Sequence, residues 1–168
     1  RVSHYVRLIA AALDLEENER NNLKVAAMLH DIGKIGMSDF ILGKPGPLDE
    51  IEMHTIRSHP KNGVEILKPL KQFESILPAI LHHHENYDGS GYPDGLSGEQ
   101  IPFHARIISV ADSYDVILSD RPYRPAKTSD KAIEELLRCA GKQFDPEIVQ
   151  AFVSMHVRYV DRFAHSES

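Results

Sequence analysis

Apolar residues recur every three or four positions through most of this chain, the spacing that places them on one face of a helix. Helical segments are expected at 1–13, 21–30, 48–58, 76–85, 103–119, 129–140 and 146–157. No stretch alternates apolar and polar residues as a half-buried strand does. We therefore predict an all-α protein, a single helical bundle whose apolar stripes share one core.

Proline and glycine mark where these helices are interrupted. The run 44–47 (KPGP) predicts a turn. A residue before proline avoids helical geometry and a proline suits the first helical turn, so His59-Pro60 predicts a break between two helices. The segment 86–102 is long, irregular and rich in glycine. Loops of this length inside a compact domain are usually functional, and we expect this one to cover the site formed by the histidines before it.

Ligand-type residues interrupt the apolar stripes. His30, His83, His84 and Asp112 each share a helix face with Leu, Ile, Val or Ala, whereas His82 is expected to be peripheral. A single inward histidine is more often a hydrogen-bonded core residue, and Asp112 alone could be a buried salt-bridge partner. An ionised carboxylate on such a face is costly unless it is paired or binds a metal.

Several such groups together favour a metal centre, because each would otherwise need its own polar partner. Asp31 follows His30 directly, and His59 stands at a helix junction, from which a side chain can project as a ligand. Imidazole nitrogen and carboxylate oxygen suit Zn, Fe, Mn, Ni or Co. The residue types therefore predict a transition-metal site without selecting the metal.

Length, net charge and cysteine content limit the kinds of protein and the partners that this sequence can represent. A chain of 168 residues with 42% hydrophobic content can bury one core, so we expect one domain over 1–168. The net charge of −6 gives no broad attraction for a nucleic acid polymer or an anionic membrane. Cys139 is the only cysteine; we expect a structural thiol, a reducing compartment and a cytoplasmic location. No apolar run predicts a membrane span and no signal peptide is recognised.

Six blocks in fixed order cover nearly the whole chain and resemble the HD-GYP family of the HD superfamily, whose members hydrolyse cyclic di-GMP. The blocks are HDIGK at 30–34, HPKNGVEIL at 59–67, HHENYDGSGYPDGLSGEQIP at 83–102, ARIISVADSYD at 105–115, RPYR at 121–124 and GKQFDP at 141–146. A chance match to six ordered blocks is improbable. The resemblance implies a helical bundle of HD-domain type with the glycine-rich loop near its metal site.

The resemblance also implies a role for individual residues. The metal ligands would be His30, Asp31, His59, His83, His84 and Asp112, with Asp31 bridging two ions. Asp31 and Lys34 would be catalytic, and Lys34 would contact the scissile phosphate or protonate the leaving oxygen. Tyr92, Arg121 and Arg124 would bind phosphate or the nucleotide, and guanidinium groups do suit phosphate oxygens. Two metals about 3.5–4 Å apart can stabilise both the attacking and the leaving oxygen.

The implied cofactors are two or three divalent transition-metal ions, with Fe or Mn favoured. Some family members carry a further Glu and His on the first helix that complete a third metal position. This sequence starts at Arg1, among the residues that follow that histidine, and His4 lies one helical turn too far along to replace it. We therefore expect a domain that lacks the start of its first helix, and the third metal stays open.

The leading functional hypothesis is hydrolysis of cyclic di-GMP to linear pGpG and onward to GMP. One alternative is a binding or signalling module of the same fold that has lost turnover. Another is an HD-type phosphohydrolase acting on a different nucleotide, against which the GYP-bearing loop argues. The expected partners are a cyclic dinucleotide and an upstream receiver or sensor domain, and a homodimer is left open.

Overall fold

The structure is a computed structural model that describes residues 1–120 and 125–164, with side chains described through residue 156. Its helices are α1 (Val2–Ala12), α2 (Glu17–Leu29), α3 (Asp39–Leu42), α4 (Glu50–Arg57), α5 (His59–Leu67), α6 (Leu77–His82), α7 (Phe103–Ile117), α8 (Ser129–Cys139) and α9 (Pro146–Ala164), with short 3-10 helices η1 (Ile32–Lys34), η2 (Lys71–Ile76) and η3 (Gly98–Gln100). Only isolated β-bridges, and no strands, occur among these residues. The all-α prediction is confirmed.

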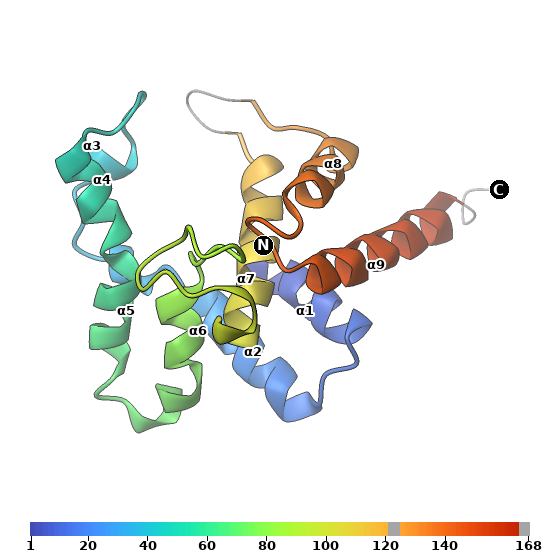
Figure 1. Ribbon diagram of the computed structural model, residues 1–168, viewed down its shortest axis with the longest axis horizontal. Coiled ribbons are helices and arrows are strands. Elements are labelled where there is room, and N and C mark those ends of the chain that lie inside the picture. Colours follow the sequence, from blue (N-terminus) through green and yellow to red (C-terminus); the bar gives the residue numbers. More distant parts are fainter. Residues whose placement is uncertain (121–124, 165–168) are drawn as a thin grey trace.

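Helix α7 forms the centre of the bundle. It contacts α1, α2, α6, α8 and α9, and it lies between the α5–α6 pair and the α1 and α9 helices (Figure 1). Ile107, Ile108, Val110 and Ala111 are fully buried. The sequence pattern predicted one inward face for this segment, but α7 has neighbours on several sides and is buried around most of its circumference.

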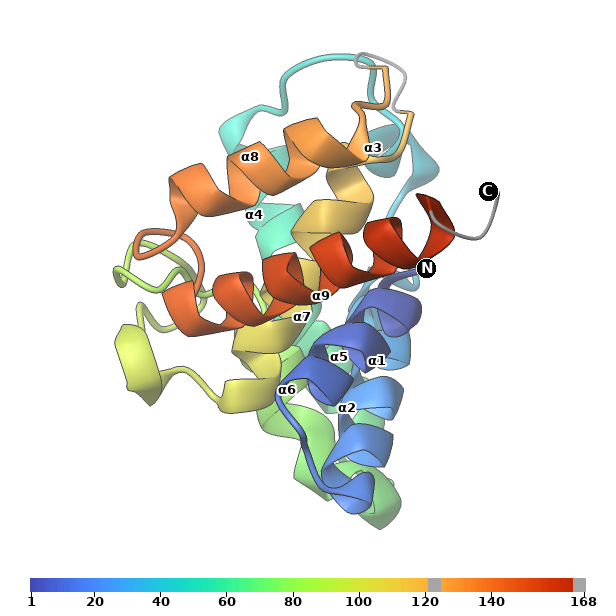
Figure 2. The ribbon, with the colours of Figure 1, turned by 90° about the vertical axis from the view of Figure 1, so that its right-hand side faces the viewer.

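An aromatic cluster holds α9 against this centre. Tyr114 of α7 packs edge-on against Tyr5 of α1 and Phe152 of α9, with ring centroids 4.9 and 4.8 Å apart. In Figure 2, α9 crosses in front of α7 at a steep angle. In helix α8, Leu136 is buried whereas the adjacent Leu137 is 47% exposed, so not every apolar residue of the predicted helix 129–140 faces the core.

A close approach of two backbones joins η1 to α5. A Cβ atom on Gly33 would lie 1.9 Å from the carbonyl oxygen of His59 and 2.5 Å from the nitrogen of Gly63, so only glycine fits. The chain leaves α2 at Leu29 and turns into η1 immediately after Asp31. This turn places Asp31 beside the start of α5. The predicted break between two helices is present, but it falls at Ser58, and His59 and Pro60 already belong to α5.

The glycine-rich segment 86–102 folds back over the end of α6 (Figure 1). The buried carboxylate of Glu85 accepts hydrogen bonds from the backbone nitrogens of Asp94 (2.8 Å) and Gly95 (3.1 Å). The nitrogen of Tyr92 donates to the carbonyl of His84 at 3.2 Å. The loop therefore lies next to the histidines, as expected. Among the described helices, none is long and apolar enough to span a bilayer.

Candidate metal centre

Three histidines on three different elements share one local arrangement. The Nδ1 atoms of His30, His59 and His83 lie 2.8, 2.7 and 2.7 Å from the backbone carbonyl oxygen three residues earlier. Because a carbonyl only accepts, Nδ1 carries the proton in each ring. In the neutral ring, Nε2 then keeps its lone pair available for a metal.

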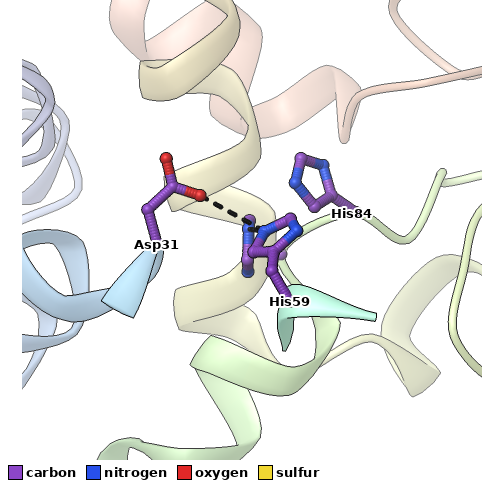
Figure 3. A group of neighbouring side chains, drawn as sticks. Asp31, His59 and His84 are labelled. Carbon is purple, nitrogen blue, oxygen red and sulfur yellow. Dashed lines mark hydrogen bonds and ion pairs between the residues drawn. The ribbon is translucent and has the colours of Figure 1, made fainter. Parts of the chain in front are cut away.

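The Nε2 atoms converge on one carboxylate. Asp31, His59, His83 and His84 each offer a ligand atom, and these four atoms lie within 4.8 Å of one another. His59 Nε2 is 3.2 Å from both Asp31 Oδ1 and His83 Nε2, and Figure 3 shows Asp31, His59 and His84 around the same space. Metal–nitrogen bonds of about 2.1 Å separate neighbouring ligand atoms by roughly 3.0–3.4 Å. The observed spacing fits ligands of a single ion.

The second oxygen of Asp31 faces a different group. Oδ2 lies 3.6 Å from His30 Nε2, which is itself 3.7 Å from Asp112 Oδ1. His30 Nε2 is buried and has no hydrogen-bond partner among the described residues. A buried polar atom without a partner is costly unless a ligand satisfies it. The two oxygens of Asp31 therefore face two separate groups of candidate ligands, and the other five predicted ligands gather around this carboxylate, Asp112 by way of His30.

Charge states in this cluster suit a cation. Burial, followed by the charge of His84, holds the pKa of His83 well below its ordinary value, and burial lowers the pKa of His84 to about 4. Burial alone would raise the pKa of Asp31, but its contact with His59 and the charges of His30 and Lys34 lower it strongly. Near neutral pH His83 and His84 are thus neutral imidazoles, and Asp31 is an ionised carboxylate.

His30 behaves differently from its neighbours. Burial alone would lower its pKa, yet the Asp112 carboxylate, 3.7 Å from Nε2, and the charge of Asp31 raise it. A positive charge between these two carboxylates is therefore favourable. A metal ion would supply the same charge at the same position and would require His30 to be neutral.

Lys34 and Tyr92 lie at the edge of the cluster. Lys34 Nζ donates to Asp31 Oδ2 at 2.7 Å, and its side chain is 35% exposed. The Tyr92 ring stacks on His84, and the Arg57 guanidinium lies 5.3 Å from the Tyr92 ring centroid. Burial raises the pKa of Tyr92 to about 12, so its hydroxyl stays protonated. Arg121 and Arg124 lie outside the described residues.

The prediction that His82 is peripheral is wrong. Its side chain is 12% exposed, and its Nδ1 lies 3.6 Å from Glu85 Oε1 and 3.9 Å from Asp94 Oδ2. The sequence reasoning also missed the role of Glu85 in holding the loop and the contact of Arg57 with Tyr92. Glu85 directly follows three consecutive histidines, which is a signal that it could belong to the same environment.

Comparison with known proteins agrees with this geometry. The family model described as HD domain matches residues 1–148. The chain is 48% identical over 155 residues to the cyclic di-GMP phosphodiesterase response regulator RpfG of Xanthomonas campestris, covering 91% of this chain and 41% of that protein. It is 41% identical over 151 residues to 3'3'-cGAMP-specific phosphodiesterase 3 of Vibrio cholerae, covering 90% of this chain and 33% of that protein.

The fold comparison gives the same result. The structure of Bd1817, an HDG"Y"P protein from Bdellovibrio bacteriovorus, superposes with a TM-score of 0.74 at 20% identity, over 90% of this chain and 48% of that one. This chain therefore spans less than half the length of each of these proteins. The order of the sequence blocks, the helical fold and the convergent His and Asp residues lead to one assignment: the chain belongs to the HD domain family.

Proposed function

We propose that this domain is a metal-dependent phosphodiesterase that hydrolyses a cyclic dinucleotide, with cyclic di-GMP as the favoured substrate. The observation that carries the proposal is the position of Asp31, whose two oxygens face two groups of candidate ligands. Such a carboxylate suits the two-metal sites that cleave phosphate esters. The names of the two relatives, which act on cyclic di-GMP and 3'3'-cGAMP, support the substrate class.

In the proposed site, His30, Asp112 and Asp31 Oδ2 would hold one ion, and Asp31 Oδ1, His59, His83 and His84 would hold the other. Fe or Mn is favoured, Zn, Ni and Co suit the same donors, and a third ion would need further ligands. When bound, such ions supply positive charge to phosphoryl oxygens and acidify a water molecule.

In the proposed reaction, a side chain of the protein assists the departure of the leaving oxygen. A water oxygen forms a bond to phosphorus and releases a proton to solvent. The bond from phosphorus to one ribose oxygen breaks, and that oxygen takes up a proton. Lys34 is proposed to donate this proton or to stabilise the departing charge, because its ammonium lies beside Asp31 and is partly exposed. The product is linear pGpG, which a second round of hydrolysis converts to GMP.

Substrate binding is proposed to involve the loop that follows the histidine pair. Tyr92 stands over His84 and carries a protonated hydroxyl that can donate to a phosphate oxygen. Arg121 and Arg124 are proposed to contact the other phosphate, on the basis of their chemistry and their sequence block alone.

We further propose that this domain works in the cytoplasm as the output module of a longer signalling protein, joined to an upstream receiver or sensor domain. The relatives support this, because the chain matches only 41% of a protein named as a response regulator. The lone cysteine fits a reducing compartment.

The decisive experiment is product chromatography with protein purified anaerobically and loaded with Fe or Mn. Wild-type protein is expected to convert cyclic di-GMP to pGpG, and the Asp31→Ala variant is expected to release no product. Binding of cyclic di-GMP without product would favour the signalling-module alternative. Hydrolysis of nucleoside mono- or triphosphates alone would favour a different HD-type phosphohydrolase.

A further inference from the structure

A cavity of about 310 Å³ opens beside the histidine pair, between α7, α8 and the turn at 140–144, and we call it the α7–α8 cavity. His83, His84 and Asp112 line one end of it. Its volume falls at the lower end of the range of roughly 300–1,000 Å³ for small-molecule sites. A ligand whose phosphate sits at the candidate metal centre can therefore extend into this cavity.

The wall formed by α7 carries two serine hydroxyls that make no hydrogen bond to the described residues. Ser109 and Ser113 lie four residues apart on the same face of α7 and both line the cavity. Helical serines commonly donate to the carbonyl four residues earlier, as Ser119 does to Asp115 at 2.6 Å. Neither Ser109 nor Ser113 has a hydrogen-bond partner for its hydroxyl within residues 1–120 and 125–164. Both hydroxyls are thus available to a ligand.

The opposite wall carries an acceptor and an amide. The Glu135 carboxylate lines the cavity from α8, while Arg138 donates to both of its oxygens at 2.9 and 2.5 Å. The Cys139 thiol is a third, weak donor, 3.7 Å from Oε1. A carboxylate has about four acceptor positions, so one remains for a ligand, and a second is available if the thiol contact is given up. Two backbone hydrogen bonds fix the position of Gln143. Its nitrogen donates to the carbonyl oxygen of Cys139 at 3.0 Å, and its carbonyl oxygen accepts from the nitrogen of Tyr87 at 3.1 Å. Its side-chain amide also lines the cavity.

Lys127 also lines the cavity, and its charge contributes to lowering the pKa of Glu135. The apolar part of the lining suits a flat ring. Val116, Ile117 and Phe144 contribute apolar surface between the two polar walls. An apolar slot with hydrogen-bonding groups at its edges is the usual form of a nucleobase pocket. Guanine presents N1–H and N2–H donors side by side, whereas adenine presents an N6–H donor beside an N1 acceptor. An ionised carboxylate can only accept, so it complements guanine and repels the adenine N1 lone pair.

We propose that the α7–α8 cavity binds one nucleobase of the cyclic dinucleotide, and that Glu135 selects guanine over adenine there, assisted by Ser109, Ser113 and Gln143. This inference rests on the phosphodiesterase function proposed above and adds the part of the site that reads the base. Arg138 keeps the pKa of Glu135 below its ordinary value, so the carboxylate is ionised at neutral pH. Residues of α8 thereby become specificity determinants although they lie outside the six sequence blocks.

The test compares Glu135→Gln with two matched controls on the same helix. Glu134→Gln removes an exposed carboxylate that pairs with Lys131, and Arg138→Gln breaks the Glu135 ion pair while keeping the Glu135 carboxylate. For each protein, calorimetry gives Kd for hydrolysis-resistant phosphorothioate analogues of cyclic di-GMP and cyclic di-AMP. Turnover of the natural compounds and of 3'3'-cGAMP is measured in parallel.

Wild-type protein and Glu134→Gln are expected to bind the guanine analogue more tightly than the adenine analogue. Glu135→Gln should reduce this preference by about tenfold or more, and Arg138→Gln should retain most of it. An unchanged preference in Glu135→Gln, or a wild type that does not prefer guanine, overturns the proposal. Failure of wild-type protein to cleave any cyclic dinucleotide, with the binding preference intact, contradicts the proposed function alone.

Discussion

The imidazole of His84 lies nearly parallel to the ring of Tyr92, with centroids 4.9 Å apart and planes inclined by 20°. This stack links a candidate metal ligand to the glycine-rich loop. The carboxylate of Glu85 holds the loop by accepting two backbone hydrogen bonds, and the guanidinium of Arg57 in α4 lies over the Tyr92 ring. The orientation of His84 and the substrate contact proposed above therefore both involve Tyr92.

We predict different effects for two substitutions of Tyr92. Tyr92→Phe keeps the ring and should leave metal content unchanged, raising KM for cyclic di-GMP only through loss of the hydroxyl. Tyr92→Ala removes the support of His84 and should weaken metal binding by about tenfold, as loss of an outer ligand contact does. Metal titration of both variants and of wild-type protein tests this, and equal metal affinity in the alanine variant would remove the supporting role.

A second prediction concerns the bridging position of Asp31. Asp31→Ala should lose most of its bound metal, because each oxygen of this carboxylate faces its own group of ligands. Asp39→Ala, which removes an exposed carboxylate from the first turn of α3, is the matched control and should keep its metal. Elemental analysis by mass spectrometry of anaerobically purified protein gives the content. Full occupancy in Asp31→Ala would contradict the bridging role.

Periodicity in the sequence was enough to place His30 and His83 inside the bundle, because helical spacing fixes which face a residue occupies. It could not bring Asp31 to His59, since that contact depends on two backbones meeting at Gly33 and Gly63, thirty residues apart in the chain. Because glycine has no side chain, the hydrophobic pattern of the sequence does not reveal that these two glycines come into contact. His82 was misplaced for a related reason, because its contacts with Glu85 and Asp94 depend on how the chain folds back after α6.

Contacts between segments that are distant in the chain also decide which residues are buried in the outer helices. Helical spacing predicted a helix at 129–140 but not which of its adjacent leucines is buried: α8 packs against α7 and α9, and Leu136 is buried there while Leu137 stays exposed. The α7–α8 cavity was not predicted at all. Its polar groups come from α7, from α8 and from the turn at 140–144, and such residues acquire a role only when the fold places them beside the histidines.

A third prediction tests the contact between η1 and α5. Gly33→Ala forces a methyl group into the backbone of His59 and should lower the free energy of unfolding by about 3 kcal/mol. Gly46→Ala is the control, because a Cβ atom there meets nothing within 4 Å. Its unfolding free energy should change by less than about 0.5 kcal/mol. Urea unfolding followed by circular dichroism compares the two, and equal stability would mean that the backbones are not in contact.

The last prediction separates chemistry from metal binding at Lys34. Its ammonium lies 2.7 Å from Asp31 Oδ2 at the edge of the cluster, where it can reach a bound phosphate without being a ligand. Lys34→Ala should therefore lower kcat for cyclic di-GMP by about 10²-fold or more while metal content stays near that of wild-type protein. Lys34→Arg keeps the positive charge but releases a proton poorly. A kcat for Lys34→Arg above that of Lys34→Ala indicates that Lys34 stabilises charge, and a kcat equal to that of Lys34→Ala indicates that Lys34 donates a proton. Lys61→Ala, an exposed change on α5, controls for loss of a surface charge. If Lys34→Ala loses metal in proportion to activity, Lys34 acts by holding Asp31 in place and not on the leaving oxygen.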